Sequence, residues 1–228
     1  FQRHQRPLCT SGETDSLMSR LVIGLTGNIA TGKSTILKYL AEKGAAIIDA
    51  DKLAHRVMEP GGAAYEAVVR SFGREILNED STINRKRLGE IVFSDTSALG
   101  RLEKLVHPKV FDLGNQEIEE AKSPLVILEA IKLLEAGLMV TLCDEVWVVI
   151  SNFANQLRRL MDNRSMEESR AEHIIGIQPP QAAKVNQADR VIDNNGALDE
   201  LYAQLDSIWA DLSQRYPIQM AALQPVTE

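Results

Sequence analysis

The feature that most constrains this chain is a glycine-bounded loop between a short apolar run and an amphipathic segment. Residues 27–34 read G-N-I-A-T-G-K-S and match the pattern G-x-x-x-x-G-K-[ST]. The run at residues 21–25 is typical of a buried strand, and Ile36, Leu37 and Leu40 recur at helical spacing after the loop. The loop therefore stands in the strand, loop and helix context that this pattern requires.

The loop is suited to bind the phosphates of a nucleoside triphosphate. Gly27 and Gly32 can adopt backbone conformations that are closed to residues with a Cβ atom, so consecutive N–H groups can turn inward around phosphate oxygens. The helix that begins at Lys33 adds unpaired N–H groups and a positive dipole end. A plain glycine-rich turn is the alternative, and the complete motif in its required context argues against it. The predicted nucleotide-binding residues are Gly27, Asn28, Ile29, Ala30, Thr31, Gly32, Lys33, Ser34 and Thr35.

Two side chains of this stretch have separate predicted roles. Lys33 is placed to reach the outer phosphates, where its charge would offset theirs. The Ser34 hydroxyl is a hard oxygen ligand of the kind that suits Mg²⁺.

The composition limits the partners of the chain. Its 228 residues carry a formal net charge of −7, which argues against nucleic acid, because phosphate-backbone binding usually shows as a basic domain or patch. No apolar run approaches the roughly 18 residues of a membrane span. Cys9 and Cys143 make neither a disulfide framework nor a metal cluster. We expect a monomeric protein of the cytoplasm, without a nucleic-acid or membrane partner.

The first 19 residues show no hydrophobic periodicity, and we expect this extension to be disordered. It lacks the apolar core of a signal peptide, and Glu13 and Asp15 are unusual in a transit peptide. The folded part is expected to begin near Met18 and to form a single domain over residues 20–228.

Two carboxylates follow the second predicted strand. Residues 45–49 are expected to form a short buried strand that ends in Asp49-Ala50-Asp51. In open α/β sheets ligands gather at the carboxyl ends of the strands, so both carboxylates fall on the rim that carries the phosphate loop. Asp51 either N-caps the helix that begins at Lys52 or takes part in the chemistry, and the two roles are compatible.

Helices dominate the next stretch of the chain. Periodicity predicts helices over residues 63–72, 85–93, 98–106 and 110–121, and a break at His107-Pro108 separates the last two. We expect this helical insertion, about residues 57–122, to select the substrate.

The remaining apolar runs supply the centre of the sheet. Residues 124–129 and 146–150 are typical of parallel strands that are covered on both faces, and residues 190–193 form a last strand before an amphipathic helix over 198–212. Glu129 ends its strand on the ligand rim. Its carboxylate either holds Mg²⁺, directly or through water, or is a solvated strand-end side chain.

Basic residues gather on two helices predicted at residues 155–164 and 167–177. Arg158, Arg159, Arg164 and Arg170 lie in a region, about residues 153–180, that is placed to close over phosphates as a lid. A solvated helical face is the alternative for each arginine. The whole pattern predicts an α/β protein of the three-layer P-loop NTPase fold, with a parallel sheet, a helical substrate-binding insertion and a helical lid.

Several stretches, in their order and spacing, resemble dephospho-CoA kinases over about residues 20 to 212. The matching stretches are residues 25–35, I-D-A-D at 48–51 with Ala54, E-P-G at 59–61, L-V-H-P at 105–108, 156–159 and 188–194. The resemblance implies transfer of the ATP γ-phosphoryl group to the 3′-hydroxyl of dephospho-CoA, which gives CoA and ADP in the last step of coenzyme A synthesis. The implied ligands are ATP with Mg²⁺, and dephospho-CoA.

The resemblance also implies roles for individual residues. By position, Lys33 and Ser34 hold phosphates and Mg²⁺, Asp51 faces the acceptor hydroxyl, and Arg164 is the lid arginine. Arg159 and Asn194 lie in matching stretches and are expected to bind ATP. The role of His107 is expected to be structural.

Two departures from the family pattern concern turnover more than fold. The acidic residue is Glu129, but the Pro-Leu-Leu segment that usually follows is replaced by A-I-K-L-L at residues 130–134. Ile174 stands where the family usually has a lid arginine. Arg170 is four residues earlier on the same helical face and is the candidate to replace it.

Three other functions compete with this interpretation. One is a kinase for another small hydroxyl or nucleotide acceptor, because the phosphate loop and lid serve any of them. A nucleotide-dependent switch is a second, although the sequence shows neither a water-positioning residue nor a base-recognition motif. The third is a degenerate kinase kept as a binding protein, which the loss at Ile174 permits.

Overall fold

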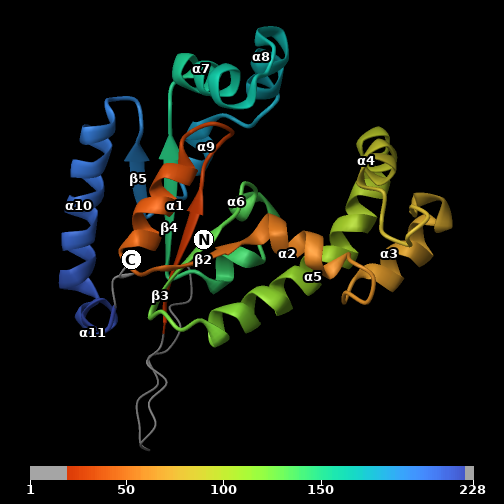
Figure 1. Ribbon diagram of the computed structural model, residues 1–228, viewed down its shortest axis with the longest axis horizontal. Coiled ribbons are helices and arrows are strands. Elements are labelled where there is room, and N and C mark those ends of the chain that lie inside the picture. Colours follow the sequence, from red (N-terminus) through yellow and green to blue (C-terminus); the bar gives the residue numbers. More distant parts are fainter. Residues whose placement is uncertain (1–19, 224–228) are drawn as a thin grey trace, which may run out of the picture. The chain divides into compact units, whose positions relative to one another are not determined.

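The computed structural model describes residues 20–223, so the extension predicted to be disordered lies outside the described residues (Figure 1). The chain divides into two compact units, which we describe separately: a sheet unit (described residues 20–48 and 120–223) and a helical unit (residues 49–119). None of the helices between residues 20 and 223 is long and apolar enough to cross a membrane.

The sheet unit is built on five strands in the order β2-β3-β1-β4-β5. The strands are β1 (Leu21–Thr26), β2 (Ala46–Asp49), β3 (Leu125–Glu129), β4 (Glu145–Ile150) and β5 (Arg190–Asp193). In the centre, β1 pairs in parallel with both β3 and β4, and β5 pairs in parallel with β4. The predicted α/β fold with a parallel sheet is confirmed.

The register of the central strands brings two predicted site elements to one edge of the sheet. Leu25 is paired with Glu129, so Glu129 lies beside the residue that precedes Thr26 and the phosphate loop. Parallel strands end on the same edge, and this edge therefore carries both the loop and the carboxylate.

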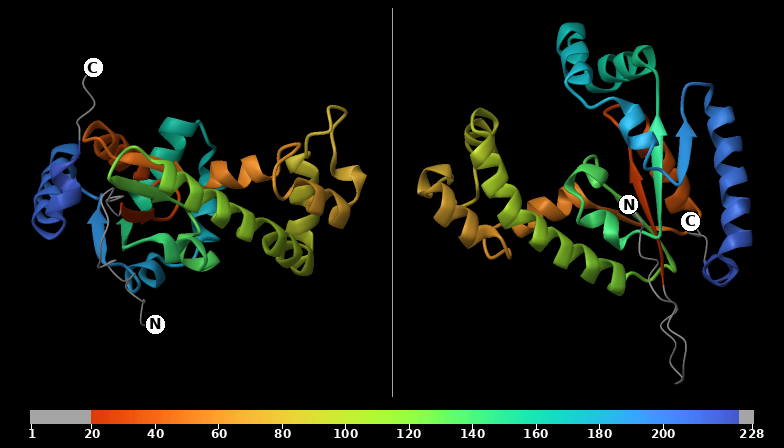
Figure 2. Two further views of the ribbon diagram at one scale, coloured as in Figure 1. Left: turned by 90° about the horizontal axis from the view of Figure 1, so that it is seen from below. Right: turned by 180° about the vertical axis from the view of Figure 1, so that it is seen from behind.

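Alternation along the strands separates two apolar faces. Leu21, Ile23 and Leu25 of β1 are fully buried on the face covered by α1 (Lys33–Glu42) and α10 (Leu198–Arg215), and α10 lies beside β5 (Figure 2). On the opposite face a Cβ at Gly24 would lie 2.6 Å from Leu133 Cδ2 and 2.8 Å from Cys143 Sγ. Glycine at this position of β1 thus leaves room for the side chains of Leu133 in α6 (Leu133–Ala136) and of Cys143, which follows η2 (Met139–Leu142).

A buried carboxylate joins the end of α10 to the start of β4. Glu145 is 4% exposed and accepts hydrogen bonds from Trp147 Nε1 at 2.9 Å, from Tyr216 Oη at 2.9 Å, and from Arg215. Burial by itself would raise the pKa of Glu145, but these hydrogen bonds and the Arg215 charge outweigh burial and lower it.

The helices α7 (Phe153–Arg164), α8 (Glu168–Gly176) and α9 (Gln181–Val185) lie toward the carboxyl ends of the strands (Figure 1). The last helix, α11 (Pro217–Ala221), follows α10 near the start of β4, where Tyr216 donates to Glu145. In Figure 1, β4 points toward α7 and α8, so the predicted lid helices follow directly from the ligand edge of the sheet. The short helix α9 was not among the helices predicted from the sequence.

One strand differs from its predicted burial. We expected a buried second strand, but β2 is at the edge of the sheet and Ile47 is 37% exposed. An edge strand has a neighbour on one side only, so an apolar side chain there is less completely covered.

The helical unit contains α2 (Ala50–Val57), α3 (Tyr65–Phe72), η1 (Arg74–Ile76), α4 (Arg85–Ser94) and most of α5 (Thr96–Glu120). The predicted break at His107-Pro108 is wrong, because Pro108 lies inside the continuous helix α5. Val106, Val110 and Ile118 form a buried stripe on both sides of the proline. Burial of this stripe outweighs the roughly 3 kcal/mol that an interior proline costs a helix.

Candidate active site

The phosphate loop has the backbone conformation that its glycines predict. Gly27 has φ +154° and Gly32 has φ +98°, both outside the range that L side chains readily adopt. A Cβ at Gly27 would lie 2.5 Å from the Val149 carbonyl oxygen, and one at Gly32 would overlap the Asn194 side chain. Gly32 is also the N-cap of α1, where no side chain of the described residues bonds to the first turn. The positive dipole end of α1 favours an anion at this position.

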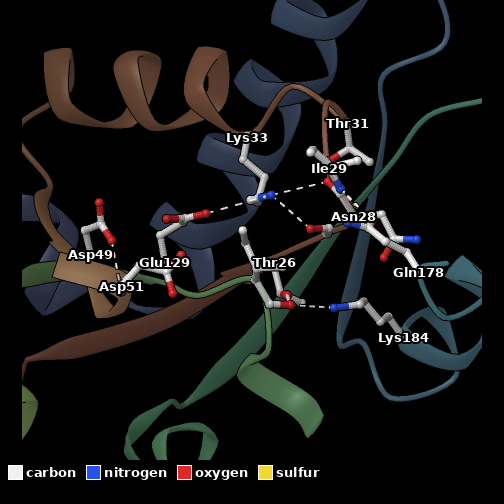
Figure 3. Close-up of polar contacts among 12 residues, drawn as sticks. Thr26, Asn28, Ile29, Thr31, Lys33, Asp49, Asp51, Glu129, Gln178 and Lys184 are labelled. Atoms are coloured by element: carbon white, nitrogen blue, oxygen red, sulfur yellow. Dashed lines mark hydrogen bonds and ion pairs between the residues drawn. The ribbon is translucent and has the colours of Figure 1, made fainter. Parts of the chain in front are cut away.

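Lys33 is folded back over the loop. Its Nζ donates to the carbonyl oxygens of Gly27 at 2.9 Å and Asn28 at 3.3 Å, and lies 3.8 Å from Glu129 Oε1 (Figure 3). The side chains of Lys33 and Glu129 are only 11% and 13% exposed. The structure thus brings together the ammonium and the carboxylate that the sequence assigned to the phosphates and the metal.

The hydroxyl and carboxylate oxygens at this edge are ligands that Mg²⁺ accepts. Ser34 is exposed in the first turn of α1, and Glu129 ends β3 beside β1. Among residues 20–223, no group of three or more His, Cys, Asp and Glu is arranged to hold a metal ion. Such a set of one hydroxyl and one carboxylate fits Mg²⁺, which usually takes one or two protein ligands together with substrate phosphates and water.

Arg159 and Asn194 hold the loop from its carbonyl side. Arg159 Nη1 donates to the carbonyl oxygens of Ala30 at 3.1 Å and Thr31 at 3.2 Å, and Asn194 Nδ2 donates to the same Thr31 oxygen at 2.8 Å. Burial, with a smaller contribution from the Arg158 charge, lowers the pKa of Arg159. With its carbonyl groups held in this way, the loop can present its N–H groups to phosphate. Direct contact of Arg159 and Asn194 with ATP stays a prediction.

Two glutamines, which the sequence did not indicate as site residues, contact the phosphate loop. Gln156 Nε2 donates to the Ile29 carbonyl oxygen at 2.6 Å, and Gln178 Oε1 accepts from Ile29 N at 2.8 Å. Asn28 Nδ2 adds a bond to the Pro179 carbonyl oxygen at 2.9 Å. A signal was present for Gln156, because it lies on the same face of α7 as the buried Leu160, where an apolar residue is expected. Both ends of the predicted lid are thereby attached to the phosphate loop.

Arg164 is placed differently from Arg159. It is exposed in the last turn of α7, and it makes no hydrogen bond or ion pair with any residue between 20 and 223. Ser165 follows with φ +48°, so the chain turns sharply between α7 and α8. Its role as the lid arginine stays a prediction.

The carboxylate that caps α2 is Asp49 rather than Asp51. Asp49 is the N-cap, and its Oδ1 accepts from Asp51 N at 3.0 Å and Lys52 N at 3.1 Å. The sequence alternative in which Asp51 caps a helix that begins at Lys52 is therefore wrong, because α2 begins two residues earlier, at Ala50. Asp51 is exposed in the first turn, where a carboxylate is favourable to the helix dipole.

A family model of dephospho-CoA kinase matches residues 21–200, from β1 into α10. The chain belongs to the dephospho-CoA kinase family. A dephospho-CoA kinase from Geobacter sulfurreducens is 41% identical over 199 residues, which cover 86% of this chain and 99% of that protein. Another from Fusobacterium nucleatum is 39% identical and covers 83% and 97% of the two chains. The resemblance inferred from the sequence motifs is confirmed.

Solved structures agree with the family assignment. The crystal structure of TT1252 from Thermus thermophilus superposes with a TM-score of 0.73 at 32% identity and covers 85% of this chain and 98% of that one. Dephospho-CoA kinase from Campylobacter jejuni gives a TM-score of 0.63 at 26% identity with the same coverage. A shikimate kinase from Bacteroides thetaiotaomicron, at 16% identity and a TM-score of 0.50, shows the shared fold alone. Membership in the dephospho-CoA kinase family makes this chain a P-loop kinase.

Proposed function

We propose that this kinase transfers the γ-phosphoryl group of ATP to the 3′-hydroxyl of dephospho-CoA. The family match over residues 21–200 carries the proposal, since it spans the phosphate loop, the helical unit and both lid helices. The loop supports it chemically, because Lys33 lies within reach of both the loop backbone and Glu129. We further propose that the enzyme acts as a monomer in the cytoplasm.

The bonds that change in the proposed reaction are few. The acceptor oxygen forms a bond to the γ-phosphorus, the bond to the β,γ-bridging oxygen breaks, and ADP leaves with that electron pair. The loop N–H groups and Lys33 hold the phosphates in line, and we assign Ser34 and Glu129 to Mg²⁺, which would offset phosphate charge when bound. We assign Asp51 to orient the 3′-hydroxyl and accept its proton, and Arg164 to neutralise charge on the transferred group.

The lid arginines of this enzyme would differ in position from those of the family pattern. Ile174 and Arg170 are both on α8, four residues apart, and Arg170 is exposed. We propose that Arg170 serves in place of the arginine that the family pattern has at Ile174. Measured turnover distinguishes this arrangement from a kinase that has become a binding protein.

We propose that the helical unit binds the part of dephospho-CoA that lies away from the reacting hydroxyl. It contains a cavity of about 450 Å³ whose wall includes His55, Glu59 and Arg85. Hydrogen bonds from Asn78 Nδ2 to Thr82 Oγ1 at 3.0 Å and from Asn84 Nδ2 to Asn78 Oδ1 at 2.8 Å stiffen one side of the cavity. A preformed cavity supports acceptor binding, because contacts with remote parts of a substrate help to position its reacting group.

A coupled assay of ADP release tests the proposed function. We expect ADP to form with dephospho-CoA and not with a panel of nucleoside monophosphates or without an acceptor. The control is Lys33→Ala, which should keep less than about a tenth of the wild-type kcat because the lysine both positions and neutralises the phosphates. Faster turnover with a nucleoside monophosphate would assign a different acceptor, and ADP release that is independent of any acceptor would indicate a nucleotide hydrolase.

A further inference from the structure

A buried lysine, Lys184, lies on the short helix α9 that follows the predicted lid helices in the chain. Lys184 of α9 is 4% exposed, and its Nζ donates to the Ile131 carbonyl oxygen at 2.5 Å and lies 2.8 Å from Glu135 Oε1. A buried ammonium group is costly to desolvate, and replacing such a group and its partner by apolar side chains is often neutral or stabilising. Stability alone is therefore a weak reason for a lysine at this position.

The carbonyl group that Lys184 binds belongs to the segment that follows Glu129. Ile131 O also accepts a hydrogen bond from Thr26 Oγ1 at 3.1 Å, and Ala130 N donates to Leu25 O at 3.2 Å. Thr26 is the residue immediately before the phosphate loop, and its side chain is fully buried. Figure 3 shows Lys184 and Thr26 close together on one side and Glu129 beside Lys33 on the other.

Lys184 thus completes a short chain of contacts from the lid to Glu129, the carboxylate that we assign to Mg²⁺. The segment from Gln178 to α9 is attached to the phosphate loop at its start, through Gln178 Oε1, and to Ile131 at its end, through Lys184. Ile131 is two residues from Glu129, and a carboxylate at the end of a strand moves with the turn that follows it. Partners of this kind orient the groups that themselves hold a metal.

We propose that Lys184 is a positioning residue, which fixes the Ile131 carbonyl group and thereby holds Glu129 in place beside Lys33. The proposal rests on the assignment of Glu129 to Mg²⁺ under the proposed function. Lys184 itself contacts neither substrate in this arrangement, and its effect passes through the backbone of residues 129–131. The competing explanation is that Lys184 only stabilises the packing of α9.

Amide hydrogen exchange of the protein without ligands tests the backbone step directly. In Lys184→Met we expect exchange in residues 129–136 to be at least about 10-fold faster, because the turn loses the bonds that restrain it. Lys38→Met is the matched control, since Lys38 is a lysine of the same unit whose side chain is 78% exposed. Unchanged exchange in Lys184→Met would overturn the proposal.

Enzyme kinetics test whether Lys184 acts through Glu129. For Lys184→Met we expect a fall in kcat of about 10-fold and a rise of several-fold in the Mg²⁺ concentration for half-maximal rate, with the KM for dephospho-CoA within about twofold of wild type. Nucleotide affinity measured with and without Mg²⁺ gives a readout apart from turnover, and only the value with Mg²⁺ should weaken. Equal weakening in both conditions would contradict an action through Glu129.

A double-mutant cycle separates failure of this proposal from failure of the metal assignment. If Lys184 acts through Glu129, adding Lys184→Met to Glu129→Gln should change kcat by less than about threefold. Multiplied losses would make the two residues independent and overturn the proposal. A Glu129→Gln variant with wild-type kcat and Mg²⁺ requirement would instead refute the assignment of Glu129.

A second variant covers the case in which Lys184→Met does not fold. Thr26→Val removes the other hydrogen bond to Ile131 O and leaves the lysine charge in place. We expect faster exchange in residues 129–136 and a higher Mg²⁺ requirement, and wild-type values of both would overturn the proposal.

Discussion

Arg159 provides the sharpest test of how the phosphate loop is supported. Its guanidinium donates to four oxygen atoms: Ala30 O, Thr31 O, Ser151 Oγ at 3.0 Å and Asn194 O at 2.9 Å. Arg159→Met keeps much of the side-chain volume and removes every donor. A hydrogen bond from a charged group contributes about 1.5–3 kcal/mol to stability.

The expected magnitude follows from how many of these oxygens water can reach. Arg159 is half-buried, so water can replace part of the lost hydrogen bonding in the variant. We therefore count the loss as equivalent to two hydrogen bonds, which lowers the free energy of unfolding by about 3 kcal/mol. For a protein of this size, 1 kcal/mol corresponds to about 2–4 °C, so Tm should fall by roughly 6–12 °C. A loop that is less well organised should also raise the Kd for ATP, by about 10-fold for each 1.4 kcal/mol of ordering that binding must supply.

The assay pairs thermal unfolding with calorimetric titration of ATP on the same preparations. Arg158→Met is the matched control, because Arg158 is the exposed neighbour on α7 and bonds only to Asn155 Oδ1 at 3.3 Å among the described residues. It should change neither quantity appreciably. An Arg159→Met variant with the Tm of the control and a Kd for ATP raised more than about 100-fold would refute support of the loop and favour direct contact with the nucleotide.

Three other changes test the remaining assignments. Arg164→Ala should lower kcat more than ATP affinity, because a lid charge contributes most in the transition state, and equal losses would make Arg164 a ground-state anchor. Asp51→Asn should lower kcat by roughly 100-fold at an almost unchanged Tm, whereas Asp49→Asn keeps a capping side chain and should keep its rate; a larger kinetic loss at Asp49 would reverse the assignment. Glu145→Gln should lower the free energy of unfolding at pH 7 by about 2 kcal/mol. Folding lowers the pKa of Glu145 from a reference value of 4.5, so its contribution to stability is present above about pH 4.5 and is lost as the pH falls through the folded-state pKa. The wild type should therefore lose its stability advantage over Glu145→Gln in acid. A constant difference in stability down to about pH 2 would contradict the buried network.

Local patterns in the sequence were sufficient to predict two kinds of element: those that depend on local backbone conformation, and those that consist entirely of buried apolar residues. The runs at residues 125–129 and 146–150 are buried on both faces, an environment typical of parallel strands between two layers of helices. The phosphate loop could be predicted because its function depends on positive φ angles at positions 27 and 32, which glycine adopts most readily. Glu129 could be placed on the ligand edge because parallel strands end together.

Two errors had different causes: at Pro108 burial outweighs a local preference, and at the start of α2 two residues suit the same position. Pro108 is a helix breaker by its own chemistry, yet α5 continues through it because the apolar stripe on both sides is buried. For the N-cap of α2, Asp49 and Asp51 are equally suitable by residue type. The choice depends on which of them leaves the strand with extended backbone angles, and Asp49 does so at φ −102° and ψ +106°.

The sequence by itself determined the fold class, the phosphate loop and the family, because each depends on residue types at fixed short spacings. Only the tertiary structure decided which side chains support that loop. Gln156, Gln178 and Lys184 reach their partners over 127, 149 and 53 residues of chain. Such contacts leave no periodic pattern in a single sequence, because they depend on how the end of the lid returns to the edge of the sheet. A buried polar side chain is recognised only once its partner is known.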